Sequence, residues 1–198
     1  MSKETTATIT SPIDSLAKTP AWLRATGIVL AGSAFAALCA HVSLPLFFTP
    51  VPLSLAPFAV LVVGLALTPR MAAATFAAYL LEGAAGLPVF APSPAIGGLA
   101  HLLGPTGGYL LAYPIAAALI SFLFRRSRRG YVSAFVSAAI GDLLILSCGA
   151  LWLAAITHVA VMQATALALL PFLAGDALKI AAAAAVRSGF ARLRHPTA

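Results

Sequence analysis

The sequence predicts an all-α integral membrane protein with six transmembrane helices and structured, Pro/Gly-rich loops on the outer side. The first observation is composition: 61% of the 198 residues are hydrophobic, only 9% are charged, and the mean hydropathy is +1.00. The second is that the apolar residues fall in long runs separated by short breaks. The third is that nearly all cations lie outside these runs. A soluble domain of this size could not bury so much apolar surface.

The expected spans are 15–26 residues long, against the roughly 20 residues that a helix needs to cross a bilayer. We expect a disordered cytoplasmic tail over residues 1–20, a membrane domain over 21–187 and a basic cytoplasmic tail over 188–198. The fifth span is long enough to tilt or to contain a break at Gly149. The six expected spans cover about residues 25–42, 53–67, 71–85, 109–124, 131–156 and 165–186.

The positions of the cations predict the orientation. Eleven of the twelve Lys and Arg residues lie on the tails and the even-numbered loops, including four arginines at 125–129. Cytoplasmic loops carry such an excess of Lys and Arg, so both termini should face the cytoplasm across the inner (plasma) membrane. The net charge of +7 therefore reflects topology, and we expect no nucleic-acid partner. Lys179 is the one cation that topology does not explain.

Two apolar segments rich in Pro or Gly, 44–52 and 87–104, should both lie on the outer side. Non-helical backbone at membrane depth persists only where it packs on protein or lines a cavity. We therefore expect these segments to cover an outward-facing pocket, with Phe48 and Phe90 as apolar walls. Ordinary interfacial loops are the alternative.

Asp176 and Lys179 lie inside the last apolar run. Placing either group near the centre of a membrane helix costs roughly 2.5–3.5 kcal/mol. Their spacing of three residues puts them on one helix face, where they partly neutralise each other. One interpretation is a structural ion pair that locks this helix against a neighbour. The other is a ligand site in which Lys179 meets an anion and Asp176 accepts hydrogen bonds.

Two further carboxylates fall within the expected spans. Glu82 lies about 18 Å along the third span from its cytoplasmic end, at 1.5 Å per residue, and so in the outer half. Asp142 lies nearer the inner side of the fifth span. A helix–helix hydrogen bond and a functional role are equally compatible with Asp142.

Motifs for catalysis, energy coupling and metal binding are missing from the sequence. It contains no GxxxxGK[ST], GxSxG or HExxH motif, and its histidines do not stand at metal-ligand spacing. Cys39 and Cys148 both lie in apolar runs, where we expect free thiols and no disulfide. We therefore expect neither an enzyme nor a bound cofactor or metal.

The first span carries small residues at four-residue spacing, Gly32, Ala36 and Ala40. Such a face lets another helix approach closely. It could bind a partner protein or pack within the molecule, and we predict it as a partner-binding face.

Five motifs follow one another along the chain: Val51-Pro52, Thr68-Pro69-Arg70, Gly86-Leu87-Pro88-Val89-Phe90, Leu103-Gly104-Pro105-Thr106-Gly107-Gly108-Tyr109 and Pro171-x-x-x-Gly175-Asp176-x-x-Lys179. Together they resemble the BioY family, and the likeness runs from about residue 25 to 187. The resemblance implies the six-helix S-component fold of energy-coupling-factor (ECF) transporters, with biotin bound near the outer surface. It also implies partnership with a transmembrane T component and two ATPase subunits, although some family members lack them.

The resemblance also suggests how biotin would be held. Lys179 would pair with the biotin carboxylate, while Asp176 or Glu82 would accept from the ureido N–H groups. Tyr109 or a backbone N–H would donate to the ureido carbonyl. Phe90 and the paired glycine Gly98 complete the expected substrate site; some relatives carry a basic residue just before that glycine pair, where this chain has Ile96. The alternatives are an S component for another small vitamin and a non-transport intramembrane enzyme or assembly factor.

Overall fold

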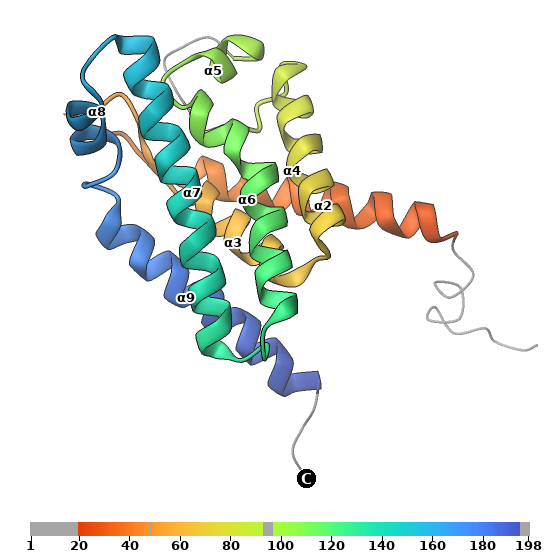
Figure 1. Ribbon diagram of the computed structural model, residues 1–198. Helices are drawn as coiled ribbons and strands as arrows, with labels where there is room; N and C mark the ends of the chain where they lie inside the picture. Colours follow the sequence, from red (N-terminus) through yellow and green to blue (C-terminus); the bar gives the residue numbers. More distant parts are fainter. Residues whose placement is uncertain (1–19, 48, 93–96, 195–198) are drawn as a thin grey trace, which may run out of the picture.

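The computed structural model describes residues 20–47, 49–92 and 97–194, and it is built mainly from helices (Figure 1). A two-residue antiparallel pair of strands, with Ser43 opposite Ser54, joins the first two helices. The elements in chain order are α2 (Ala21–His41), β1 (Ser43–Leu44), β2 (Leu53–Ser54), α3 (Ala56–Ala66), α4 (Pro69–Ala84), α5 (Leu99–Leu103), α6 (Gly107–Arg126), α7 (Tyr131–Thr157), α8 (Val161–Ala168) and α9 (Leu173–Arg194).

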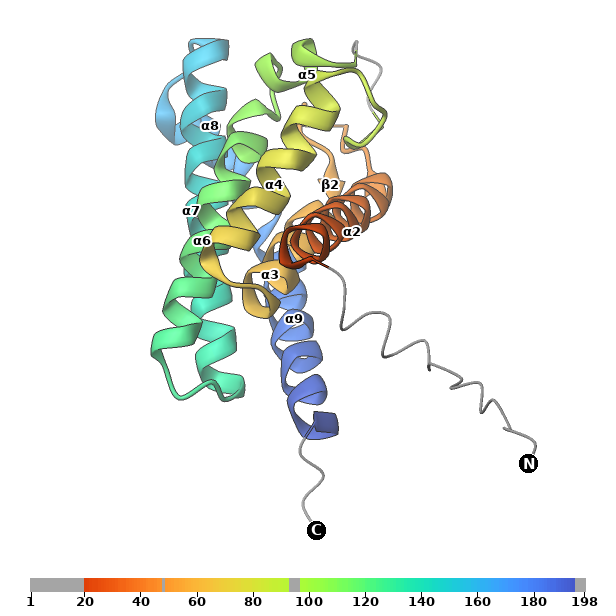
Figure 2. The same cartoon turned by 90° about the vertical axis from the view of Figure 1, so that its right-hand side faces the viewer.

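Helices α4, α6 and α7 run along the long direction of the molecule, and α2 crosses that direction (Figures 1 and 2). Helix α3 lies in the interior, where Ala59, Val60 and Leu61 are completely buried. The N-terminal part of α2 projects from the bundle and exposes Trp22 and Leu23. The apolar length of a helix such as α2 does not determine its tilt, because packing against neighbouring helices sets the tilt.

Within the described residues, three helices are long and apolar enough to cross a membrane, namely α2, α6 and α7. Helix α3 is apolar but has only 11 residues, or about 16 Å at 1.5 Å per residue. That length is about half of a typical hydrocarbon core. The chain is a helical membrane protein, and the count of six spans stays a prediction.

The single sixth span expected over residues 165–186 is wrong. The chain forms α8 and then α9, with a break between Ala168 and Leu173. Pro171 falls in this break, and proline lacks the N–H that a continuous helix would need there. Asp176 consequently lies in the first turn of α9 rather than mid-helix. A carboxylate is favourable there because a helix N-terminus carries partial positive charge.

Two other boundaries also differ from the sequence expectation. Helix α7 is continuous through Gly149, so the possible break in the fifth span is absent. Helix α9 continues to Arg194, and the first part of the expected tail over 188–198 is therefore helical. The expected tail over residues 1–20 lies outside the described residues, except for Pro20.

Glycines bring α6 and α7 into close contact. A Cβ added at Gly149 would lie 2.2 Å from the ring of Tyr109, and one added at Gly141 would lie 2.2 Å from the Ile120 side chain. Real Cβ atoms do not approach other atoms so closely, so both positions need glycine unless the neighbour moves. Small residues serve this purpose at membrane helix interfaces. The contacts fix how α7 is rotated relative to α6.

The small-residue face of α2 packs inside the molecule, against α4. A Cβ at Gly32 would lie 2.7 Å from Cγ2 of Thr75, and Ala36 and Ala40 are 1% and 0% exposed. Ala36 and Ala40 therefore pack inside the molecule, whereas Gly32 is only partly buried. Binding of a partner by Gly32, Ala36 and Ala40 stays a prediction.

Arginines close the end of the molecule that lies opposite α5. Nε of Arg187 donates to the carbonyl of Leu65 at 3.2 Å, and Nε of Arg125 donates to the carbonyl of Leu67 at 3.3 Å. The last carbonyls of a helix lack partners within the helix, so these bonds cap the C-terminal end of α3. The α6–α7 loop and the far end of α9 both lie at this end of the molecule (Figure 1).

Candidate functional site

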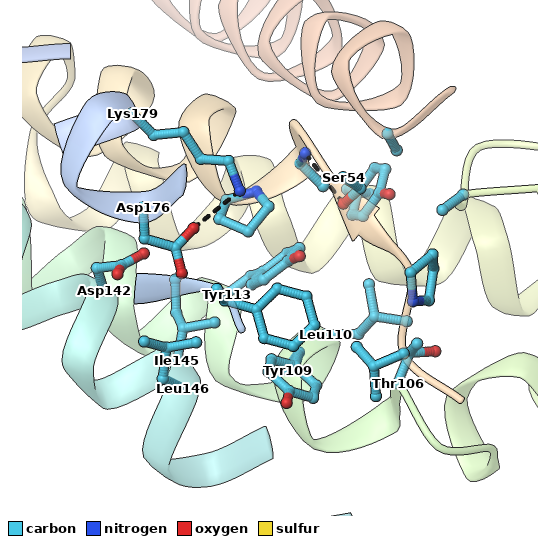
Figure 3. Close-up of a pocket in the computed structure, with 18 of the residues that line it drawn as sticks. Ser54, Thr106, Tyr109, Leu110, Tyr113, Asp142, Ile145, Leu146, Asp176 and Lys179 are labelled. Carbon is cyan, nitrogen blue, oxygen red and sulfur yellow. Dashed lines mark hydrogen bonds and ion pairs between the residues drawn. The ribbon is translucent and has the colours of Figure 1, made fainter. Parts of the chain in front are cut away.

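A cavity lies where α3 and α9 begin, between α6, α7 and the hairpin of β1 and β2 (Figure 3). Most of its wall is apolar, with a few polar side chains, as is usual for small-molecule sites. The lining residues are Ala40, Val51, Pro52, Ser54, Ala56, Pro57, Tyr79, Ala91, His101, Thr106, Tyr109, Leu110, Tyr113, Asp142, Ile145, Leu146, Phe172, Asp176 and Lys179.

One end of the cavity is charged. Nζ of Lys179 lies 2.8 Å from Oδ1 of Asp176, and the two side chains are 8% and 5% exposed. The i, i+3 spacing on α9 allows this pair to form, as the sequence predicted. Asp142 of α7 lines the same end and is 3% exposed. Two carboxylates therefore accompany one ammonium at this end.

The middle of the cavity is aromatic. Tyr109 and Tyr113 lie one helical turn apart on α6 and both line the cavity. The ring of Tyr113 stacks on that of Tyr79 from α4, with the centroids 6.5 Å apart. The hydroxyl of Tyr79 donates to the carbonyl of Val89 at 3.0 Å, which ties the segment after α4 to this wall. An apolar ring system would fit between these aromatic faces.

The rest of the lining includes neutral polar groups, among them Ser54 and Thr106, and Figure 3 shows Thr106 on the far side of the tyrosines from Lys179. His101 of α5 also lines the cavity, and burial lowers the pKa of its imidazole below the ordinary value. At neutral pH this ring is uncharged, so one nitrogen donates and the other accepts.

Both outer segments expected to cover a pocket do border the cavity. Val51 and Pro52 come from the first segment, and Ala91 and His101 come from the second. Phe90 is 7% exposed and stacks on His101, with the ring centroids 5.1 Å apart, but it stands behind the cavity wall. Phe48 lies outside the described residues.

Besides Phe90, two more of the predicted substrate residues lie away from the cavity lining. Glu82 accepts a hydrogen bond from Oγ of Ser33 on α2 and faces a shallow groove beside Leu30 and Leu38. Gly98 precedes α5 with a φ of +72°, a conformation that suits glycine, and starts the helix that carries His101. Asp176, Lys179 and Tyr109 are the predicted residues that the structure brings together at the cavity.

The sequence carried signals for the lining residues that were not singled out. Tyr113 follows Tyr109 by four residues and so shares its helix face. Ile145 and Leu146 stand three and four residues after Asp142, whose functional role the sequence had left open, and so share its helix face. No periodicity predicts His101 or Ser54, because they lie on a five-residue helix and a two-residue strand, which are too short to show one.

The BioY family model matches residues 7–195. The chain is 40% identical to the probable biotin transporter BioY of Pyrococcus horikoshii, over 68% of this chain and 76% of that protein. It is 36% identical to biotin transporter BioY2 of Lactococcus lactis, over 77% of this chain and 81% of that protein. A crystal structure of the S-component for biotin from an ECF-type ABC transporter has the same fold, with a TM-score of 0.77 at 24% identity, covering 87% of this chain and 92% of that one. The chain therefore belongs to the BioY family.

Proposed function

We propose that this protein is the biotin-binding S component of an ECF-type transporter and takes part in biotin uptake. The cavity carries this proposal. It joins a charged end, an aromatic middle and an end with neutral hydroxyl and imidazole groups. Biotin presents the matching parts in one molecule: a ureido head with two N–H donors and a carbonyl, an apolar thiophane and valeryl chain, and a carboxylate. The relatives named above are called biotin transporters, which supports the same substrate.

The charges at the cavity favour one orientation of biotin. Lys179 is already bonded to Asp176, and Asp142 adds a second carboxylate beside them. A ligand carboxylate placed there would meet an excess of negative charge, whereas ureido N–H groups would find acceptors. We therefore place the ureido head at this end, with Asp176 accepting from an N–H and Lys179 donating to the carbonyl.

The biotin carboxylate would then lie toward Ser54, Thr106 and His101, which can donate hydrogen bonds. This orientation replaces the pairing of Lys179 with the carboxylate that the resemblance suggested. Tyr109 contributes to the aromatic wall around the thiophane. Phe90 supports that wall from behind through Tyr79 and His101. Glu82 and Gly98 have no direct contact with the ligand in this proposal.

Energy for uptake would come from partners. The sequence has no P-loop, so a transmembrane T component and two cytoplasmic ATPase subunits would supply it. We place both termini in the cytoplasm across the inner (plasma) membrane, since the arginine-rich end fits the cytoplasmic side. The cavity then opens toward the outer half of the membrane.

Uptake by a biotin-auxotrophic bacterium that lacks its own biotin transporter tests the proposal. Cells that express this chain should accumulate radiolabelled biotin, either alone or with T and ATPase subunits, and unlabelled biotin should compete. Native mass spectrometry of the purified protein should show one bound molecule of biotin's mass. The proposal would be rejected if the purified protein contained no biotin and if cells took up no biotin, both with this chain alone and with the T and ATPase subunits.

A further inference from the structure

Asp142 is a buried carboxylate that the fold itself does not use. The residue is 3% exposed, and its Oδ1 has no hydrogen-bond partner within the part of the chain that the structure describes. Buried polar atoms are nearly always hydrogen-bonded, and an unpaired carboxylate is among the most costly exceptions. A group kept at such a cost needs a reason outside the packing of the helices.

The packing of α7 aims this side chain at the cavity. Gly141 lies against Ile120 and Gly149 lies against Tyr109, so that two close contacts fix the rotation of α7 relative to α6. Asp142, the next residue after Gly141, then shares the cavity face with Ile145 one turn further along. Figure 3 shows Asp142 and Asp176 on neighbouring helices at the same end of the cavity.

Lys179 does not relieve the unpaired oxygen. Its ammonium bonds to Oδ1 of Asp176 at 2.8 Å, and no hydrogen bond joins it to Asp142 among the described residues. Glu82, the third acidic side chain among the described residues, accepts a hydrogen bond from Ser33 on α2. Asp142 lines the cavity, so a ligand bound there with a suitably placed N–H would give its carboxylate the missing hydrogen-bond partner.

We propose that Asp142 is a second ligand-binding carboxylate, which accepts one ureido N–H of biotin while Asp176 accepts the other. This inference rests on the proposed function and adds a specificity-determining residue to it. Two acceptors on separate helices, α7 and α9, would select a ring with two N–H donors. A ligand that lacks one of them would leave a buried carboxylate unpaired, which is how a site rejects such analogues strongly.

Asp142→Asn tests the role because it keeps the shape of the side chain and removes the charge. Biotin should bind about 5- to 10-fold more weakly, because the amide oxygen still accepts a hydrogen bond but a bond to a neutral group is weaker than one to a charged group. The melting temperature of the ligand-free protein should stay the same or rise, because the substitution removes an unpaired buried charge. Ser137→Ala, a buried polar position on the same helix outside the cavity lining, serves as the matched control and should leave affinity unchanged.

A second ligand sharpens the comparison. Biotin derivatives methylated on either ureido nitrogen lack one N–H each. One of the two derivatives lacks the N–H that Asp142 is proposed to accept, so Asp142→Asn should hardly weaken its binding further. The effects of methylation and substitution are then not additive, and the derivative that shows this identifies the nitrogen that Asp142 contacts. Wild-type protein that binds no biotin would overturn the proposed function and this inference with it. If the wild type binds biotin and Asp142→Asn changes the affinity by less than about threefold, only the inference is overturned. The same holds if Asp142→Asn lowers the affinity and also lowers the melting temperature of the ligand-free protein.

Discussion

Nζ of Lys179 lies 2.8 Å from Oδ1 of Asp176 in the first turns of α9, and this ion pair is buried beside the cavity. Breaking a buried pair by removing one partner is costly, whereas replacing both partners with neutral groups is often tolerated. The pair therefore serves two purposes. It places a positive charge against the Asp176 carboxylate next to the cavity, and it holds that carboxylate at a fixed position.

Lys179→Met should destabilise the ligand-free protein by about 3–5 kcal/mol, because it leaves the Asp176 carboxylate buried without its cation. The double variant Lys179→Met with Asp176→Asn should recover most of this loss. Melting temperatures in detergent measure both effects. Equal melting temperatures for the single and double variants would show that the pair does not act as a unit.

Lys179→Met should also weaken biotin and biotin amide by similar factors, since the proposed orientation places Lys179 at the ureido head, which the two ligands share. A selective loss of the acid would instead place the ligand carboxylate at Lys179. Calorimetric titration of both ligands distinguishes the two orientations.

Glu82→Gln should leave biotin affinity within about twofold of the wild type, because Glu82 bonds to Ser33 outside the cavity lining. Direct titration of the purified variant provides the measurement. A large loss of affinity without a change in melting temperature would return Glu82 to the binding site.

Ala36→Trp should lower the melting temperature of the isolated protein, because Ala36 is 1% exposed in the contact between α2 and α4. Overpacking of this kind costs about 1–3 kcal/mol. Ala31→Trp, on the exposed side of the same helix, is the control and should have little effect. If Ala36→Trp left the isolated protein intact and blocked only assembly with a T component, the small-residue face would be a docking surface after all.

Labelling of single cysteines tests the orientation. In a variant whose Cys39 and Cys148 are replaced by alanine, Ala100→Cys should react with an impermeant maleimide from outside intact cells. Arg128→Cys should react only after permeabilisation, because positively charged loops stay in the cytoplasm. Both positions are exposed, so a missing reaction reports sidedness rather than burial. The reverse pattern would contradict cytoplasmic termini.

Composition and motif order were sufficient to predict the helical membrane class, the S-component fold and the pairing of Asp176 with Lys179. These features depend on local spacing and on hydrophobic runs that a sequence displays directly. The sequence also indicated that the outer segments border a pocket. Their prolines disfavour a long helix, and their apolar side chains favour packing against protein over a solvated loop.

The features that sequence did not reveal depend on contacts between distant segments. Composition could not tell that Gly32 packs against Thr75, because a small-residue face suits a partner and a neighbouring helix equally well. Glu82 looked like a cavity residue by depth, but its rotation on α4 turns it toward Ser33. Pro171 was visible, yet the apolar run on both sides concealed the break between α8 and α9.

Calorimetric titration of the purified protein with biotin tests the central claim most directly. We predict saturable binding of one biotin per chain, weakened about 10-fold or more in Asp176→Asn, which removes the carboxylate proposed to accept a ureido N–H. Thiamine and riboflavin should not compete. Absence of biotin binding by correctly folded protein, or displacement of biotin by either vitamin at similar concentration, would contradict the assignment of this cavity to biotin.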